Sequence, residues 1–484
     1  MPLLQRASEA QFRVFDDFGV IHFLNYAAVV HPTGKALDAQ GAGCLVSKSQ
    51  EKVVWLDEFR ILHRLNLQFM NSNKLAPLAT AAVVFSAATL NAQEWTRFRG
   101  PNGTGVSDAK TIPVKWTEKD YNWKVKLPGT GHSSPVVWGN RIFLTTTDPR
   151  NAGNTLRSHS VKDGSLLWDV KIDFAPFRKH KLNSFAASTP CVDKDRVYMT
   201  WSTPDKHVAV AFSHDGKKAW ERDLGSFASS HGLGASAILF EGKLIVPNDQ
   251  NEDSHMVALD VKTGKTIWKT ARKGSEKTAY STPCVHAPKG ERASLIFNSF
   301  SYGISAMDPD TGKMLWTYED AFDKRSCSSP VIGGGVIIGS TGSGGGGNFV
   351  TAIRPGDRAG KKPELAWRLH EAAPYVPTPV YHDGNFYMIS DKGIASCVDA
   401  KSGSVRWRER VCGRTFGAPV LVDGKLYGIS TAGEVVVIRA SEQFEQIAKN
   451  DLNEEIQTTP AIAHGTLFIR TTGHLISLGG KQSL

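Results

Sequence analysis

Three stretches of nine residues follow one pattern: DVKTGKTIW at residues 260–268, DPDTGKMLW at 308–316 and DAKSGSVRW at 399–407. In each stretch a Thr-Gly or Ser-Gly pair follows the Asp, and a Trp stands four residues after the Gly. The pair predicts a tight turn, because Gly tolerates the positive φ that such a turn needs. The Trp is then expected on the outer strand, where its large ring can fill the wedge between neighbouring repeats. We therefore predict a structural docking role for the tryptophans of this series: Trp123, Trp168, Trp220, Trp268, Trp316, Trp367 and Trp407.

A second landmark is a small residue followed by Pro and an apolar run. It occurs at Pro135, Pro190, Pro283, Pro330, Pro379, Pro419 and Pro460, with Ala237 in the place of the Pro in an eighth copy. Both series repeat at roughly 40–55 residues, a period that is typical of propellers and solenoids. Between the landmarks, turn signals such as Asp-Gly alternate with β-rich runs, so each repeat is expected to hold four antiparallel strands.

The expected fold is all-β, an eight-bladed β-propeller of four-stranded antiparallel blades. The last repeat ends without a Trp strand, whereas NWKVKL at 122–127 precedes the first blade. We predict that this N-terminal strand completes the last blade and so leaves no unpaired edge.

The first 92 residues differ in composition from the repeats. From Met70 the sequence has a Lys, an apolar run over 75–90 and a small residue at Ala92, which is typical of a secretory signal peptide. We predict that residues 1–69 precede a true start at Met70 and are not translated, that 70–92 is the signal peptide, and that 93–484 is the propeller. The alternative is an internal apolar helix that joins two domains. The apolar run is short for a membrane span, so a periplasmic or secreted monomer is expected.

The formal net charge of +10 raises the question of nucleic-acid binding. The basic residues are scattered, and the densest run, 178–181, is short, so a solvated loop is the preferred interpretation and no nucleic-acid partner is expected. Five cysteines follow residue 92: Cys191, Cys284, Cys327, Cys397 and Cys412. None is adjacent to another and no C-x-x-C occurs, so neither a metal nor a redox role is expected.

Candidate ligand-binding residues lie just before each inner strand. Long connections at 147–156, 170–187, 221–234, 248–255 and 339–347 are expected on one face, which repeat folds often use for binding. The residues expected around the channel mouth on that face are His132, Phe185, His231, Tyr280, Arg325, Tyr375, Arg414, Phe416 and Gln457. Such a set suits a planar or anionic ligand. The alternative is that these side chains fill the channel together with water.

One acidic loop, at 249–255, resembles the start of a calcium loop, with Asp249, Asn251 and Asp253 at alternate positions. Ser254 replaces the turn Gly and Asp260 the expected Glu. A hairpin loop is therefore preferred to a metal site.

The A-x-D-x-x-T-G-x-x-x-W repeat resembles that of the pyrroloquinoline-quinone propellers over about residues 95–480. WTRFRGPNGTGVS at 95–107, LPGTGHSSPVV at 127–137, NSFAASTP at 183–190 and SSHGLGASAIL at 229–239 are similar to exported propellers of planctomycete-like bacteria. Those are likened to polyvinyl-alcohol dehydrogenases or to the propeller that assists outer-membrane protein assembly.

The resemblance implies two classes of function. Quinone-dependent dehydrogenases of this family bind quinone and calcium and use a catalytic Asp, a Trp floor and usually a vicinal disulfide. This chain has no adjacent cysteines, and its repeat tryptophans are assigned to outer strands. The preferred hypothesis is a binding or scaffold module for an extracytoplasmic protein, a polymer or a small anionic or aromatic ligand. The alternative is a quinone-dependent alcohol or polymer dehydrogenase with a divergent site, in which case pyrroloquinoline quinone and calcium are its cofactors.

Overall fold

The computed structural model describes residues 8–15, 21–30, 36–37, 94–148, 150 and 152–480. The chain divides into two compact units, residues 1–87 and 88–484. In the first unit β1 (Ser8–Phe15), β2 (Ile21–Val30) and β3 (Ala36–Leu37) form an antiparallel sheet. The predicted signal peptide at 70–92 lies outside the described residues, and the prediction that residues 1–69 are not translated stays a prediction.

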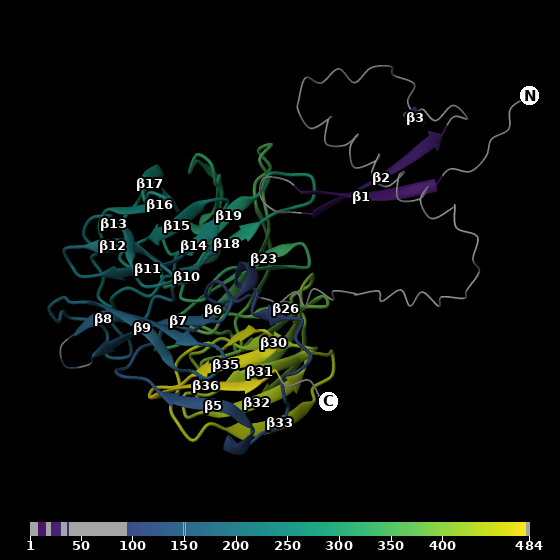
Figure 1. Ribbon diagram of the computed structural model, residues 1–484. Helices are drawn as coiled ribbons and strands as arrows, with labels where there is room; N and C mark the ends of the chain where they lie inside the picture. Colours follow the sequence, from purple (N-terminus) through teal and green to yellow (C-terminus); the bar gives the residue numbers. More distant parts are fainter. Residues whose placement is uncertain are drawn as a thin grey trace, which may run out of the picture. The chain divides into compact units, whose positions relative to one another are not determined.

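The second unit is an eight-bladed β-propeller of four-stranded antiparallel blades, as predicted, and the short strand β4 (Val106–Ser107) adds a fifth, parallel strand to the sheet of the seventh blade (Figure 1). The first four blades are β6 (Val136–Trp138), β7 (Arg141–Asp148), β8 (Ala152–Ser160) and β9 (Leu166–Ile172); β10 (Cys191–Val192), β11 (Arg196–Ser202), β12 (His207–Ser213) and β13 (Lys218–Asp223); β14 (Ile238–Phe240), β15 (Lys243–Asn248), β16 (Ser254–Asp260) and β17 (Thr266–Arg272); and β18 (Cys284–His286), β19 (Ser294–Ser299), β20 (Gly303–Met307) and β21 (Met314–Tyr318).

The next four blades are β22 (Val331–Gly333), β23 (Val336–Thr341), β24 (Phe349–Arg354) and β25 (Glu364–Leu369); β26 (Val380–His382), β27 (Asn385–Ile389), β28 (Ile394–Asp399) and β29 (Val405–Arg410); β30 (Val420–Val422), β31 (Lys425–Ile429), β32 (Glu434–Arg439) and β33 (Gln446–Asp451); and β34 (Ala461–Ala463), β35 (Thr466–Arg470), β36 (His474–Gly479) and β5 (Tyr121–Lys126). Short 3-10 turns are η1 (Pro101–Gly103), η2 (Glu118–Asp120) and η3 (Glu319–Ala321). The stretch 147–156, expected as a long connection, is instead mostly the paired ends of β7 and β8.

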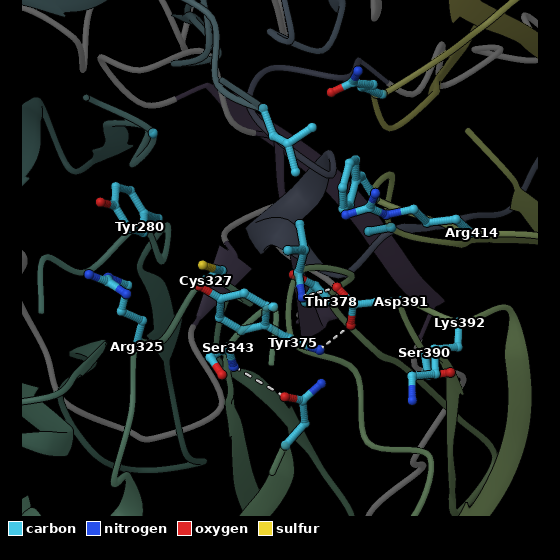
Figure 2. Close-up of a pocket in the computed structure, with 18 of the residues that line it drawn as sticks. Tyr280, Arg325, Cys327, Ser343, Tyr375, Thr378, Ser390, Asp391, Lys392 and Arg414 are labelled. Carbon is cyan, nitrogen blue, oxygen red and sulfur yellow. Dashed lines mark hydrogen bonds between the residues drawn. The ribbon is translucent and has the colours of Figure 1, made fainter. Parts of the chain in front are cut away.

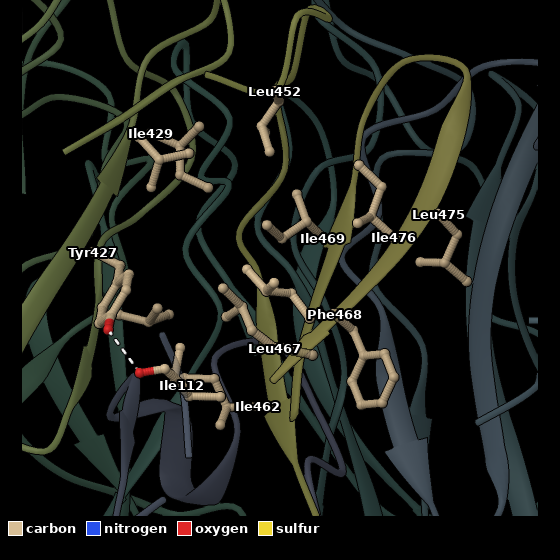
Figure 3. Close-up of a cluster of buried hydrophobic side chains, with 14 of the residues drawn as sticks. Ile112, Tyr427, Ile429, Leu452, Ile462, Leu467, Phe468, Ile469, Leu475 and Ile476 are labelled. Atoms are coloured by element: carbon tan, nitrogen blue, oxygen red, sulfur yellow. Dashed lines mark hydrogen bonds between the residues drawn. The ribbon is translucent and has the colours of Figure 1, made fainter. Parts of the chain in front are cut away.

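The ring is closed by its N-terminal strand. β5 pairs antiparallel with β36 and supplies the fourth strand of the last blade. The apolar core at this closure joins residues from both ends of the propeller, among them Ile112, Tyr427 and Phe468 (Figure 3). The Tyr427 hydroxyl donates a 3.5 Å hydrogen bond to the Ile112 carbonyl. Pairing and packing thus hold the two ends of the propeller together, as the sequence predicts.

The repeated tryptophans lie between blades. The indole Nε1–H of Trp268 donates a 2.9 Å hydrogen bond to the carbonyl of Pro309, in the turn that leads to the outer strand of the next blade. Its ring covers Gly312, where a Cβ would lie only 2.5 Å from a ring carbon. Two features therefore require Gly at position 312: its φ of +68° and the close approach of the Trp268 ring. Indole-to-carbonyl hydrogen bonds to the next blade recur at Trp123, Trp168, Trp220, Trp367 and Trp407.

A belt of hydroxyl groups connects the blades around the channel. In seven of the eight blades, the residue before the inner-strand Pro, or before Ala237 in the third blade, is Ser or Thr. The hydroxyl oxygen of each accepts a hydrogen bond from the backbone N–H of the equivalent residue in the preceding blade. The distances run from 2.9 to 3.2 Å. The acceptors are Thr189, Ser236, Thr282, Ser329, Thr378, Thr459 and Ser134. The one remaining position, in the seventh blade, holds Ala418, which has no hydroxyl. The belt is therefore broken between the sixth and seventh blades.

The N-terminal segment 94–107 occupies one end of the channel. It contacts inner strands of several blades: Trp95 bridges Val137, Asn102 hydrogen-bonds both backbone groups of Val285, and β4 (Val106–Ser107) pairs with β30 in parallel. These contacts close the channel at this end. We call the segment the plug.

Arg99 of the plug fills the gap in the belt. It is fully buried, and its guanidinium donates to the carbonyls of Thr378, Pro379 and Pro419 at 2.7–3.1 Å. Burial lowers the pKa of Arg99 to about 9, which still leaves it charged at neutral pH. The guanidinium therefore links the sixth and seventh blades where Ala418 cannot.

Arg99→Met is expected to lower the free energy of unfolding by about 3 kcal/mol, because several buried carbonyls lose their donor. Adding Ala418→Thr should recover part of the loss by supplying the missing hydroxyl. Chemical denaturation of the two variants and the wild type measures both effects. Equal stability of wild type and Arg99→Met would show that the plug does not tie these blades together.

Candidate functional site

The channel end opposite the plug is a deep cup with a volume of about 1160 Å³. Phe98 of the plug lines it, as do belt residues such as Thr189 and Thr282. Side chains of residues that come just before the inner strands line it as well. Residues of the connections 180–183, 343–348 and 370–376 form the rest of its wall. The plug therefore makes the channel a one-ended cup instead of a through-pore.

The structure brings most of the predicted mouth residues to this cup. Those that line it are His132, His231, Tyr280, Arg325, Tyr375, Arg414, Phe416 and Gln457. Phe185 does not line it. Its ring packs instead against Phe177 at 4.8 Å and Phe174 at 5.8 Å, within the connection between the first two blades. The mouth placement predicted for Phe185 is wrong because this connection folds back on its own aromatic residues. Ligand binding by the other eight residues stays a prediction.

The charge of the cup is strongly uneven. Among the described residues, four basic side chains, Arg325, Lys392, Arg410 and Arg414, line it, whereas Asp391 is the only acidic one. In the part of the chain that the structure describes, none of the four forms an ion pair with a carboxylate. The cup is thus a cationic cavity in which the charge of Asp391 offsets only part of the positive charge.

Arg325 and Arg414 lie on different sides of the cup, with Tyr375 and Asp391 between them in the view of Figure 2. The Arg325 Nε is buried and has no hydrogen-bond partner among the described residues. The Arg414 guanidinium stacks on Phe416 with its carbon 4.4 Å from the ring centroid. This stacking holds the charge in place while leaving its N–H donors available.

Asp391 is fixed by the backbone. Its carboxylate accepts hydrogen bonds from the N–H groups of Tyr375 at 2.6 Å and Val376 at 3.2 Å. Burial nevertheless raises the pKa of Asp391 above its ordinary value. Next to it, burial raises the pKa of Tyr375, and raises that of Cys327 to about 12, so the Cys327 thiol is protonated at neutral pH.

Histidines line another part of the wall. The rings of His180 and His231 stack with centroids 4.7 Å apart. Burial lowers the pKa of His231 to about 4, with Arg325 and His180 acting in the same direction, and burial likewise lowers that of His132 to about 4. Both are therefore neutral at pH 7 and add no positive charge to the cup.

The acidic loop at 249–255 does not gather its side chains around a common point. The Asp249 carboxylate is buried in an ion pair with Arg272 at 2.8 Å, and Asn251 bonds to Ser275 and Thr278. Within the described residues no group of three or more His, Cys, Asp or Glu side chains is arranged to hold a metal ion. The weak calcium assignment for Asp249, Asn251 and Asp253 is not supported by this geometry.

The cup matches only part of what a quinone and calcium would need. Its guanidinium groups and aromatic rings suit a carboxylated aromatic molecule. A calcium ion takes six to eight oxygen ligands, usually several of them carboxylates, and Asp391 is the single carboxylate in the lining. The residues present therefore do not fit a calcium-bound quinone.

Some features of the site were not predicted from the sequence. No role is assigned from the sequence to Phe98 or to the small residue before each inner-strand Pro. The hydroxyl series could have been found, because seven equivalent positions share a hydroxyl and one does not. The location of the plug could not, since nothing in WTRFRGPNGTGVS specifies the channel.

The eight blades and the channel that is closed at one end define the protein as an eight-bladed β-propeller with a one-ended channel. The chain matches the family model described as outer membrane protein assembly factor BamB over residues 106–226 and 152–409. It belongs to this family of quinone-type propellers, and the resemblance stated from its repeats is confirmed.

Known relatives include both enzymes and assembly factors. The chain is 24% identical over 260 residues to polyvinylalcohol dehydrogenase of a Pseudomonas species, covering 46% of this chain and 38% of the relative. It is 22% identical over 271 residues to outer membrane protein assembly factor BamB of Yersinia pestis, covering 52% of this chain and 64% of the relative. The matches span less than two thirds of the length of either relative.

Solved structures show the same fold. BamB from Moraxella catarrhalis aligns with a TM-score of 0.54 at 13% identity, over 75% of this chain and 97% of that one. Quinohemoprotein alcohol dehydrogenase from Comamonas testosteroni aligns with a TM-score of 0.57 at 13% identity, over 81% of each chain. The described part of this chain contains no helix with the length and apolarity to cross a membrane.

Proposed function

We propose that this protein is an exported binding module that takes an anionic ligand with an aromatic or otherwise planar part into its cup. The observation that carries the proposal is the pair of guanidinium groups, Arg325 and Arg414, that line one cavity and form no ion pair among the described residues, although Asp391 is near enough to Arg414 to interact with its charge. Unpaired guanidinium groups favour carboxylate, sulfate or phosphate ligands. Phe98, Tyr375 and Phe416 provide ring surface in the same cavity.

On this proposal the ligand is a group on a polymer or on a partner protein, which reaches the cup past the connections 180–183, 343–348 and 370–376 in its wall. A periplasmic or secreted location follows from the signal-like sequence at 70–92, and the relatives named as outer membrane assembly factors support it. On this proposal the protein acts as a monomer that holds its ligand without changing it.

A quinone-dependent alcohol or polymer dehydrogenase is the second candidate. The similarity to polyvinylalcohol dehydrogenase favours it, as does Asp391, a carboxylate of raised pKa within the cup. The donor set of the cup opposes it, because Asp391 has no second carboxylate beside it with which to hold calcium.

The binding proposal is tested with benzene-1,3,5-tricarboxylate, a planar trianion, by isothermal titration calorimetry at low ionic strength. The double variant Arg325→Ala and Arg414→Ala is expected to bind at least about tenfold more weakly, since each charge-assisted hydrogen bond contributes about 1.5–3 kcal/mol. Lys425→Ala is the control, because Lys425 pairs with Asp423 and does not line the cup. Equal affinity of the double variant and the wild type would contradict the proposal.

A further inference from the structure

A glycine-rich turn forms the wall of the cup next to Arg325. Residues 343–348, SGGGGN, connect β23 to β24, and all six line the cavity. The turn is joined to the Arg325 backbone, since the Gly342 N–H donates a 3.1 Å hydrogen bond to the Arg325 carbonyl. The backbone of Arg325 is therefore joined to the chain just before the turn.

Two carbonyl groups of this turn are engaged by a lysine. Lys324 Nζ donates to the carbonyls of Gly346 at 3.0 Å and Gly347 at 3.1 Å. Gly347 has a φ of +66°, a backbone conformation that favours Gly. The ammonium group of Lys324 thus interacts with the negative ends of two peptide dipoles, the carbonyl oxygens of Gly346 and Gly347.

Two amide groups of the turn, both on exposed residues, are left available. Gly346 N–H bonds to the Ser343 carbonyl, whereas the N–H groups of Gly344 and Gly345 have no acceptor among the described residues. A Cβ at Gly344 would meet nothing within 4 Å, so the space around it is open. Turns that present successive N–H groups form concave anion-binding sites.

The geometry points to an oxyanion subsite in the cup, formed by the Arg325 guanidinium together with the amides of Gly344 and Gly345. It takes a tetrahedral oxyanion, a phosphate or sulfate group, because such a group has enough oxygens to accept from both the guanidinium and the amides. Lys324 adds positive charge behind the turn without entering the cup. The inference rests on the proposed anionic ligand and says where one of its charged groups binds.

Inorganic phosphate and sulfate are the probes, each titrated by calorimetry into the full propeller at constant ionic strength with chloride as the other anion. Both are expected to bind, and the tighter of the two identifies the group for which the subsite is built. Arg325→Met is expected to weaken binding at least about tenfold, the effect of losing one charge-assisted interaction.

Substitutions at Gly345 test the amides. Gly345→Pro removes one N–H and is expected to weaken binding severalfold, whereas Gly345→Ala keeps the N–H and should bind like the wild type. The added methyl of Ala has room, because its nearest neighbour would be the Ser343 Oγ at 3.7 Å. Equal thermal unfolding of the two variants shows that the turn is intact.

The outcomes separate this subsite from the wider proposal. If phosphate and sulfate do not bind while the tricarboxylate does, the subsite is overturned and the cationic cup stands. If Arg414→Ala abolishes oxyanion binding and Arg325→Met does not, the subsite lies on the other side of the cup and the assignment is wrong. If neither the oxyanions nor the tricarboxylate binds, both proposals fail.

Discussion

A chain that lacks residues 93–128 is expected to aggregate instead of forming a stable monomeric ring. The deletion removes β5, so β36 in the last blade loses its partner and exposes an unpaired edge. It also removes the plug and buried residues such as Trp116 and Leu127 from the core that joins the first and last blades. An exposed, apolar strand edge is a template for pairing with other chains.

Size-exclusion chromatography and thermal unfolding measure this result. A second deletion, of residues 94–107 alone, keeps β5 and is the matched control: it should stay monomeric and unfold at a lower temperature, because only the plug is lost. A monomeric 93–128 deletion with an unchanged melting temperature would show that β5 does not close the ring.

Trp268→Ala is expected to lower the free energy of unfolding by about 3–5 kcal/mol, the usual range for truncating a large buried aromatic side chain. The ring is 7% exposed and lies over Gly312 of the next blade, where no other side chain can fill the space. The hydrogen bond from its Nε1 to Pro309 is lost as well. The ring of blades should remain closed, since no strand pairing involves the indole.

Trp268→Phe is the matched control for this prediction. It keeps much of the aromatic surface over Gly312 and loses the hydrogen bond, so its cost should be clearly smaller than that of Ala. Urea denaturation of both variants measures the difference. If Ala and Phe destabilise equally, the contribution comes from the hydrogen bond and not from the ring that fills the wedge between blades.

The fold could be predicted because its information is repeated. The Trp pattern and the Pro pattern each recur along the chain, and the missing outer strand of the last repeat has one obvious replacement at 121–126. Each repeat also confirms the turn assignments of the others. A copy that departs from the pattern, such as the one with Ala237 in the place of Pro, therefore does not prevent recognition of the repeat.

The candidate site could be predicted only where it follows the repeat. Residues placed just before inner strands reach the cup because every blade has the same geometry, and this holds for His132, Arg325 and Arg414. Phe185 was misplaced because it belongs to a long connection whose path depends on contacts with Phe174 and Phe177. Contacts of that kind have no sequence period.

The plug could not be predicted for a related reason. Its position depends on hydrogen bonds from Arg97 and Arg99 to carbonyls that lie between about 180 and 320 residues further along the chain. Carbonyl groups are present on every residue, so the sequence does not show which of them an arginine will meet. Only the missing hydroxyl at Ala418 marks the place in the sequence.

We propose that the cup binds an anionic ligand and does not oxidise alcohols through a calcium-bound quinone. The most direct test supplies the purified propeller with pyrroloquinoline quinone and calcium, and measures dye reduction with primary alcohols and with polyvinyl alcohol, together with the amount of quinone retained. We expect no calcium-dependent dye reduction, and we expect any quinone retained to be held as an anion and to be released in the Arg325→Ala, Arg414→Ala double variant. Stoichiometric quinone binding with robust calcium-dependent dye reduction would instead show that this protein is a dehydrogenase.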